Sequence, residues 1–349
     1  MPVARPPGSH HGAATVSLDR PAPAAAQADR PQGVVRRTSS RLVGLIVVLA
    51  GLVVVVLFSL AVGSKPIPLG TVIDSFTAYD PTLDDHLIVR SLRVPRTVVG
   101  VLVGIALGLS GAVMQGVSRN PLADPGLLGV NAGASLAVVL GIYVFGVGSL
   151  LGYVWFGFFG AAVTSVAVYL LGSLGREGAT PVKLALAGAA VTAVLGSVTT
   201  AILLIDLATL DQYRFWVVGS IAGRDGSLAW QVAPFIVIGT VMALACGPLL
   251  NALALGDDVA RSLGQRVGLA RGFAAGSITV LVGGATAVAG PIGFVGLTVP
   301  HVARAITGPD YRWVLPYSAG LAAVLLIGSD IVGRIVAVSY THLTLPTKA

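Results

Sequence analysis

The sequence contains few charged residues and one cysteine, and both scarcities exclude classes of protein. Asp, Glu, Lys and Arg together make up 11% of the 349 residues, whereas soluble domains usually carry about 25%. Cys246 lies inside an apolar run, which excludes an intramolecular disulfide and a cysteine-based metal cluster. No cluster of His, Cys, Asp and Glu shows metal-ligand spacing, so we expect no metal site. Water is therefore not expected to be the main solvent of this chain.

Lysine is also scarce, since it occurs only at Lys65, Lys183 and Lys348. None of these residues follows a glycine-rich run and precedes Ser or Thr, as a P-loop requires. We therefore expect that the chain does not hydrolyse ATP, holds no cofactor and is not an enzyme. The net charge of +7 is spread between apolar runs and forms no basic stripe, so we expect no nucleic-acid partner.

Long apolar runs fill most of the sequence, which is 55% hydrophobic with a mean hydropathy of +0.87. One helical span across a bilayer needs about 20 apolar residues. The runs predict an all-α polytopic membrane protein whose transmembrane domain covers residues 41–336. Residues 1–40 are rich in Pro, Ala, Gly, Ser and Arg and predict a disordered cytoplasmic tail. The nine spans that we expect lie near 41–63, 94–117, 129–147, 150–172, 181–205, 228–250, 269–289, 292–308 and 312–330.

The basic residues favour one orientation of these spans. With a cytoplasmic N-terminal tail, the inner segments collect eleven Lys and Arg residues and the outer segments seven. The expected location is thus the plasma or inner membrane, crossed many times. Small residues recur at helix-contact spacing, as in Gly100, Gly104 and Gly108 and again in Gly290, Gly293 and Gly296, which predicts close packing between helices.

A turn signature follows the second span. The sequence reads RVPR from Arg93, SGAVMQ from Ser110 and NPLADPGLLG from Asn120. Two prolines and two glycines there end one helix and begin the next, and Asn and Asp side chains can bond the freed backbone groups. These residues predict a rigid re-entrant turn. Its signature residues are Asn120, Pro121, Asp124, Pro125 and Gly126.

Three further motifs follow in order, namely ALALGDDVARSLG at 252–264, GPIGFVGLTVPH at 290–301 followed by Arg304, and DIVGR at 330–334. Together with the turn signature they resemble the FecCD-like permease family, which includes ferric-siderophore, haem and cobalamin importers. The resemblance covers residues 41 to about 336. It implies a bundle of about ten transmembrane helices, of which nine can be identified here.

Segment 252–264 has a physical interpretation of its own. Val259, Leu263 and Val267 are spaced four residues apart, and Asp257 and Asp258 suit a helix N-terminus and can pair with Arg261. The spacing predicts a short amphipathic helix at the cytoplasmic surface. One interpretation is an interfacial helix on lipid. The resemblance implies instead a coupling segment that fits a cleft in a partner ATPase, made by Leu255, Gly256, Asp257, Asp258, Ala260, Arg261, Leu263 and Gly264.

Other roles rest on the resemblance. Arg93, Arg96 and Arg334 stand at outer span ends, and in the family arginines at matched positions dock a substrate-binding protein; the alternative is snorkelling to lipid phosphates. Thr180 and Pro181 belong to a loop at 173–182 that we expect to act as an inner gate.

The resemblance predicts a permease subunit of an ATP-binding-cassette importer for ferric siderophores. Its expected partners are a second permease, in a homodimer or heterodimer, two ATPase subunits that bind ATP and Mg, a substrate-binding protein and the lipid bilayer. Cobalamin or haem is an alternative cargo. An ion-coupled secondary transporter or channel is a second alternative, although the predicted spans are almost free of the charged residues that it needs. A non-transporting membrane scaffold is a third.

The last residues depart from the family pattern, which continues with a tenth apolar helix. Residues 337–349 are too few and too polar to span a membrane. We therefore expect them to be a non-native tail that replaces the last helix.

Overall fold

The computed structural model describes residues 32–63, 65–175, 180–223 and 226–341 of the chain, and all regular structure within these ranges is helical. The chain divides into two units, Met1–Ser40 and Arg41–Ala349. The elements are α1 Gln32–Ala61, α2 Leu69–Thr77, α3 Asp84–Leu87, the π-helix η1 Ile88–Arg93, α4 Val94–Ser118, the 3₁₀ helix η2 Pro125–Leu128, α5 Val130–Phe145, α6 Leu150–Ser173, α7 Pro181–Ile205, α8 Leu207–Val217, α9 Gly226–Ala254, α10 Asp257–Ser262, α11 Val267–Ala289, α12 Val295–Thr307 and α13 Tyr311–Thr341.

Seven helices in the described ranges are long and apolar enough to cross a membrane, and they match seven of the nine expected spans. The other two spans are shorter helices, α5 with 16 residues and α12 with 13. At 1.5 Å per residue, α12 is about 20 Å long, less than the roughly 30 Å of a bilayer core. It starts late because Gly290 and Phe294 have positive φ angles of 75° and 66°, which no α-helix accommodates.

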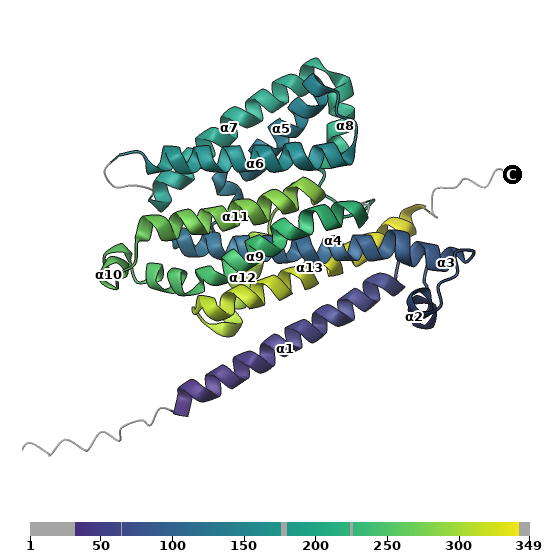
Figure 1. Cartoon of the computed structure of the whole chain (residues 1–349), viewed down its shortest axis with the longest axis horizontal. Helices are drawn as coiled ribbons and strands as arrows, with labels where there is room; N and C mark the ends of the chain where they lie inside the picture. The colour runs from purple at the N-terminus through teal and green to yellow at the C-terminus, as the bar shows by residue number, and fades with distance from the viewer. Residues whose placement is uncertain (1–31, 64, 176–179, 224–225, 342–349) are drawn as a thin grey trace, which may run out of the picture. The chain divides into compact units, whose positions relative to one another are not determined.

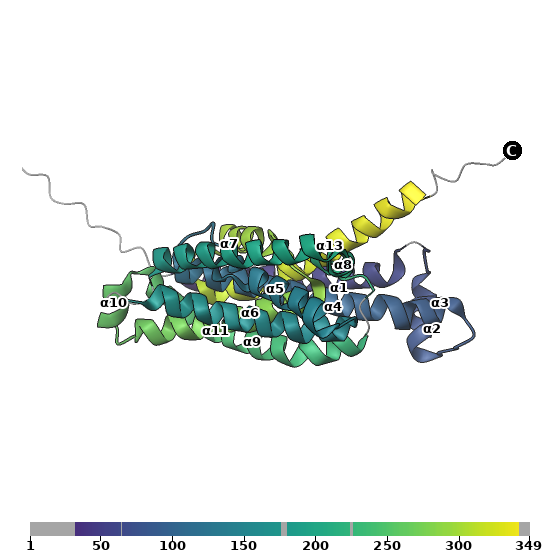
Figure 2. The same cartoon turned by 90° about the horizontal axis from the view of Figure 1, so that it is seen from above.

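The helices from α4 to α13 pack into one bundle (Figures 1 and 2). Helices α9, α11, α12 and α13 contact α4 directly, and α5, α6 and α7 form a group that reaches the rest through α11. In the most apolar 18-residue stretch of each helix, 78% of the residues are buried in α4, compared with 11% in α7 and 6% in α1. Helix α4 is therefore the centre of the bundle, whereas α1 and α7 present apolar side chains outward.

Close contacts of glycine backbones hold α4 against its neighbours, as the spacing of Gly100, Gly104 and Gly108 predicted. In the second predicted set only Gly296 lies in a helix, because Gly290 and Gly293 precede α12. A Cβ atom on Gly108 would lie 2.2 Å from the carbonyl oxygen of Ser318 on α13. One on Gly111 would lie 2.0 Å from the carbonyl oxygen of Gly296 on α12. Only glycine allows these approaches, and the gain is dispersion contact between backbones.

The two ends of the bundle carry different elements. Helix α10 lies at one end, and α2 and α3 lie at the opposite end (Figures 1 and 2). We call these the α10 end and the α2 end. From Arg41 onward, α1 runs from the α10 end, where Tyr317 bonds the Arg41 carbonyl, to the α2 end, where Arg93 bonds the Leu60 carbonyl (Figure 1). The start of the first span and the predicted coupling segment thus lie on the same side, as the charge count indicated.

Two predicted boundaries differ from the structure. The last residues of the expected disordered tail, Gln32–Ser40, are helical and belong to α1, because extending an existing helix costs little once the helix is nucleated. Helix α13 likewise continues to Thr341, into the expected non-native tail. Residues 1–31 and 342–349, which make up most of the two predicted tails, lie outside the described residues.

Candidate functional site

The coupling segment forms a short helix, α10, that projects an apolar face. Gly256 enters the helix with a φ angle of 105°, and Gly264 leaves it with 81°. The side chains of Leu255, Val259 and Leu263 are 63%, 44% and 66% exposed, although all three are large and apolar. We call these three side chains the apolar face of α10. A surface of this kind suits contact with a partner protein or with lipid.

This face differs in one residue from the sequence prediction. Val267 shares the four-residue spacing of Val259 and Leu263, but it lies at the start of α11 and is only 5% exposed. The chain turns at Gly264 between the two helices, so the periodicity breaks there. Leu255 is exposed as well, although Gly256, with a φ angle of 105°, separates it from the helix. The coupling role and the alternative of an interfacial helix on lipid both stay predictions.

Asp257 joins α10 to two core helices. Its Oδ1 atom lies 2.9 Å from Nη2 of Arg271 on α11 and 3.2 Å from Nη2 of Arg119 at the end of α4. The side chain of Arg271 is 5% exposed, so this contact is buried on the α11 side. We call Asp257, Arg119 and Arg271 the Asp257 clamp.

The neighbouring carboxylate behaves differently. Asp258 pairs with Arg261 at 2.8 Å, and both side chains are exposed. The sequence predicted this partner for both aspartates, but only Asp258 has it. The difference arises because successive helical residues point in directions about 100° apart, so Asp257 faces the bundle while Asp258 faces solvent.

The re-entrant turn after α4 has the geometry that the signature predicted. Arg119 ends α4 with a left-handed φ of 51°. The side-chain oxygen of Asn120 accepts from the Leu122 amide at 2.9 Å, and that of Asp124 accepts from the Gly126 amide at 2.8 Å. Pro125 then begins η2, and Gly129 leads into α5. Of the signature residues, Asn120 and Pro121 line a cavity that also borders Ala254 of α9, so the turn and the coupling segment meet at the α10 end.

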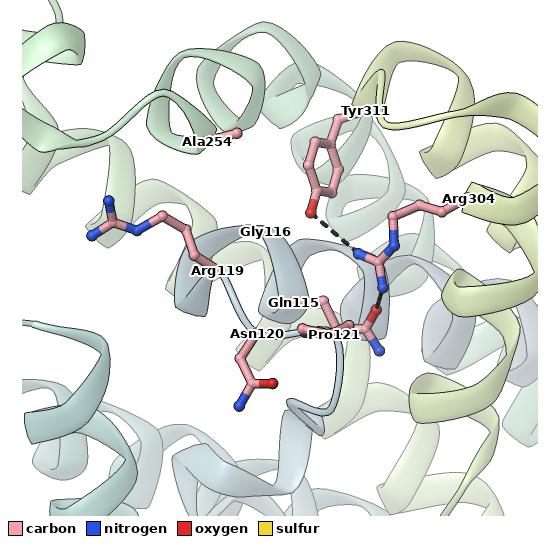
Figure 3. A pocket seen from close by; sticks show the side chains of 8 residues that line it. All are labelled: Gln115, Gly116, Arg119, Asn120, Pro121, Ala254, Arg304 and Tyr311. Atoms are coloured by element: carbon pink, nitrogen blue, oxygen red, sulfur yellow. Dashed lines mark hydrogen bonds between the residues drawn. The ribbon is translucent and has the colours of Figure 1, made fainter.

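A polar network crosses the same end of the bundle (Figure 3). Arg304 of α12 donates to Gln115 Oε1 and, at 3.4 Å, to the hydroxyl of Tyr311. The Gln115 amide donates in turn to the Leu297 carbonyl at 2.9 Å, which fixes its oxygen toward Arg304. Gln115 and Arg304 belong to the sequence motifs, but the motifs alone predicted no role for either side chain. A glutamine in an apolar span was the available signal, because polar groups there are costly unless bonded.

The predicted docking arginines gather at the α2 end, where we call them, with Asp330, the arginine cluster. Arg96 makes a bidentate contact with Asp330, with Nη2 to Oδ1 at 2.5 Å and Nε to Oδ2 at 3.0 Å. Arg334 approaches Asp330 Oδ2 at 3.1 Å. Arg93 donates to the carbonyl oxygen of Leu60 at 2.6 Å and also to that of Lys65.

These contacts hold the guanidinium groups within the chain. The exposed fractions of the side chains of Arg96, Arg334 and Asp330 are 24%, 10% and 10%, and Arg93 is 5% exposed. The snorkelling alternative is therefore not the arrangement observed, and the docking role stays a prediction. No role was predicted for Asp330, which lies in the DIVGR motif. Its spacing of four residues from Arg334 is nevertheless that of a helical ion pair.

The predicted inner gate is described in part. The Thr180 side chain caps α7 by accepting from the Lys183 amide at 3.4 Å, and Pro181 is the first residue of that helix. Residues 176–179 of the loop lie outside the described residues. The gating role stays a prediction.

Comparison with known proteins identifies the family. The model of the FecCD transport family matches residues 51–346. The chain belongs to this family. FepD, the permease protein of the ferric enterobactin transport system of Escherichia coli (strain K12), is 44% identical over 286 residues, which cover 82% of this chain and 85% of FepD. YfmD, a permease protein of an Fe(3+)-citrate import system of Bacillus subtilis (strain 168), is 41% identical and covers 87% of this chain, with 90% of YfmD matched.

A solved structure gives the same result for the fold. It is described as an inward-facing conformation of a protein assigned as a metal-chelate type ABC transporter, and it superimposes with a TM-score of 0.74 at 26% identity, covering 84% of this chain and 90% of that one. The FecCD-family chain is thus an all-helical, multi-pass protein of the inner membrane. The family and fold predictions are confirmed.

Proposed function

We propose that this chain is the permease subunit of an ATP-binding-cassette importer that takes up ferric siderophores. The names of FepD and YfmD, which refer to ferric enterobactin and Fe(3+)-citrate, support an iron-chelate cargo. The observation that carries the proposal is α10, a short helix that presents exposed apolar side chains within and beside it and is tied to two core helices. A permease that takes its energy from another subunit needs such a surface.

The apolar face of α10 is the proposed contact with a partner ATPase. Two such subunits would bind ATP and Mg, because none of the three lysines of this chain stands in a P-loop sequence. Movement of α10 would pass through the Asp257 clamp to α4 and α11, because the Asp257 carboxylate contacts Arg119 at the end of α4 and Arg271 near the start of α11. Helix α4 is the centre of the bundle, so displacement of its end moves several helices together.

The α2 end is the proposed docking surface of the substrate-binding protein. Arg96 is the most accessible of the three arginines, with 24% of its side chain exposed. Internal bonds to Asp330 hold its guanidinium in one orientation. A fixed cation sets the register of an acidic partner and speeds encounter more than it adds affinity.

A second permease chain is proposed to pack against α7. Only 11% of the apolar window of α7 is buried within this chain, although the helix packs against α5 and α6. The same chain in a homodimer, or a relative in a heterodimer, would cover this surface and leave the transport path between the two copies. Thr180 and Pro181 at the start of α7 would then lie at the inner mouth of that path.

Uptake of iron-labelled siderophore tests the function. A strain deleted for this gene is complemented with the wild-type chain, with Leu263→Asp or with the control Ser262→Asp. Leu263→Asp places a charge on the apolar face and is expected to abolish uptake, whereas Ser262→Asp adds the same charge on the neighbouring exposed position and should retain it. Uptake should also require the ATPase gene.

Three results would contradict the proposal. Restoration of cobalamin or haem uptake without siderophore uptake would refute the cargo. Uptake that continues without the ATPase and stops when the membrane gradient is collapsed would indicate an ion-coupled transporter. Equal uptake by both variants would show that the apolar face is not the coupling surface.

A further inference from the structure

A cavity of about 320 Å³ opens at the α10 end between four helices and the signature turn (Figure 3). It is roughly ten times the volume that one water molecule occupies in the liquid. The side chains that line it come from the end of α4, the turn, α9, α12 and α13, and they are Gln115, Gly116, Arg119, Asn120, Pro121, Ala254, Arg304 and Tyr311.

The charges around this cavity are of one sign. Arg119 and Arg304 line it, and no acidic side chain does so among the residues that the structure describes. Arg119 has a carboxylate partner outside the cavity, in Asp257 at 3.2 Å. Within the described ranges Arg304 has no ion pair, because its bonds go to the neutral oxygens of Gln115 and Tyr311. The partly buried guanidinium of Arg304 therefore has no carboxylate partner among the described residues.

Neutral groups of the lining also favour an anion. The carbonyl oxygen of the Asn120 side chain is occupied by the Leu122 amide at 2.9 Å, so its NH₂ group remains to donate. The carbonyl oxygen of Gln115 is likewise occupied, by Arg304. In the described hydrogen bonds the Tyr311 hydroxyl accepts from Arg304, which leaves its own proton for a ligand. The cavity therefore offers donors and few free acceptors.

We propose that this cavity binds a phosphate-bearing anion. Guanidinium groups bind phosphate through paired N–H donors, and basic pockets between transmembrane helices bind lipid headgroups. The volume accepts a phosphate together with part of the group that it is attached to. Free inorganic phosphate and the headgroup of an anionic phospholipid share this chemistry, and experiment separates them.

Thermal unfolding of the purified full-length chain in a neutral detergent tests the site. The probes are inorganic phosphate, a short-chain phosphatidylglycerol, a short-chain phosphatidylcholine and sodium glutamate, at matched ionic strength. The variants are Arg304→Gln, Ala254→Phe and the control Arg312→Gln. Arg312 is exposed next to Tyr311 and does not line the cavity, so its removal matches the change in net charge.

We expect phosphate or phosphatidylglycerol to raise the unfolding midpoint of the wild type and of Arg312→Gln. Arg304→Gln should weaken binding at least about tenfold, since charge-assisted hydrogen bonds are lost. Ala254→Phe fills the cavity and leaves every residue of the polar network unchanged in sequence, so it should also abolish the shift and serves if Arg304→Gln fails to fold.

The outcomes decide both the chemistry and its source. A shift with phosphatidylglycerol alone assigns the site to a lipid headgroup, and a shift with inorganic phosphate assigns it to a free anion. Glutamate that is as effective as phosphate would overturn the proposal in favour of a carboxylate site. No shift with any probe, or an equal loss in Arg312→Gln and Arg304→Gln, would also overturn it. None of these measurements depends on transport, so the result stands apart from the proposed function.

Discussion

Asp257→Asn tests whether the clamp transmits movement from α10 to the core. The amide keeps the shape of the side chain and removes its charge. On the α11 side, Arg271 is 5% exposed and loses its charged partner, which costs about 1.5–3 kcal/mol. On the α4 side, Arg119 is 39% exposed, so that contact contributes less than about 1 kcal/mol. The expected loss of unfolding free energy is therefore about 1.5–4 kcal/mol.

Asp258→Asn is the matched control. Asp258 is the adjacent residue, carries the same charge and lies in the same first turn of α10. Its side chain is 98% exposed and pairs only with Arg261, one turn away. Such a pair contributes about 0.2–0.5 kcal/mol. Chemical unfolding of the purified chains in detergent should separate the two variants clearly.

The functional measurement uses the chain reconstituted with the proposed ATPase and substrate-binding protein. ATP hydrolysis stimulated by loaded binding protein should fall at least about fivefold in Asp257→Asn, whereas the ATPase should still copurify because the apolar face of α10 is intact. Arg119→Gln breaks only the partly exposed contact and leaves the buried one in place. It should reduce coupling with a smaller loss of stability, which separates transmission from folding.

Equal behaviour of Asp257→Asn and Asp258→Asn in both assays would refute the reasoning. A loss of ATPase copurification in Asp257→Asn would also refute it, because the clamp would then be part of the docking surface. Normal coupling in Arg119→Gln would show that α11 alone receives the movement.

Two further substitutions test the packing and the arginine cluster by the same unfolding measurement. Asp330→Asn removes the carboxylate shared by Arg96 and Arg334 and should cost about 3–5 kcal/mol of unfolding free energy. Asp74→Asn, on the exposed face of α2, should change stability little. Similar losses of stability in the two variants would contradict a buried role for Asp330. Gly111→Val places a side chain into the α12 backbone and should cost at least about 1–3 kcal/mol, while Gly196→Ala, with open space around its Cβ position, should be tolerated. A stable Gly111→Val protein would show that α4 and α12 separate more easily than the structure implies.

Hydropathy alone located the long spans because each run exceeds the bilayer thickness and few charges interrupt it. It did not show that α12 starts at Val295, since that boundary depends on the turn between Gly290 and Phe294. This turn is fixed by neighbours far along the chain, such as the Ser220 amide, which donates to the Ala289 carbonyl at 2.7 Å. The local amino-acid composition does not indicate such a contact.

The sequence likewise predicted only part of the candidate site, because some of its contacts join residues far apart in the chain. Segment 252–264 was found, and Asp258 pairs with Arg261 as spacing predicted. The partners of Asp257 come from α4 and α11, and no local rule distinguishes one carboxylate of an adjacent pair from the other. Asp330 is the reverse case, because its bond to Arg334 follows helical spacing while its bond to Arg96 does not.

The attachment of α1 to the bundle has an evolutionary consequence. Tyr317 donates to the carbonyl oxygen of Arg41 at 2.6 Å, and at the other end Arg93 and Arg334 donate to those of Leu60 at 2.6 Å and Ser59 at 3.1 Å. Main-chain oxygens are the same for every amino acid, so these bonds do not depend on which side chains α1 carries.

Selection can therefore act on the residues that hold α1 while leaving most of its own apolar side chains free to exchange. Among homologues, α1 should vary as any lipid-facing helix does, and its positions should show weak covariation with the helices it adjoins. The residues on which selection for the placement of α1 acts therefore lie on η1 and α13.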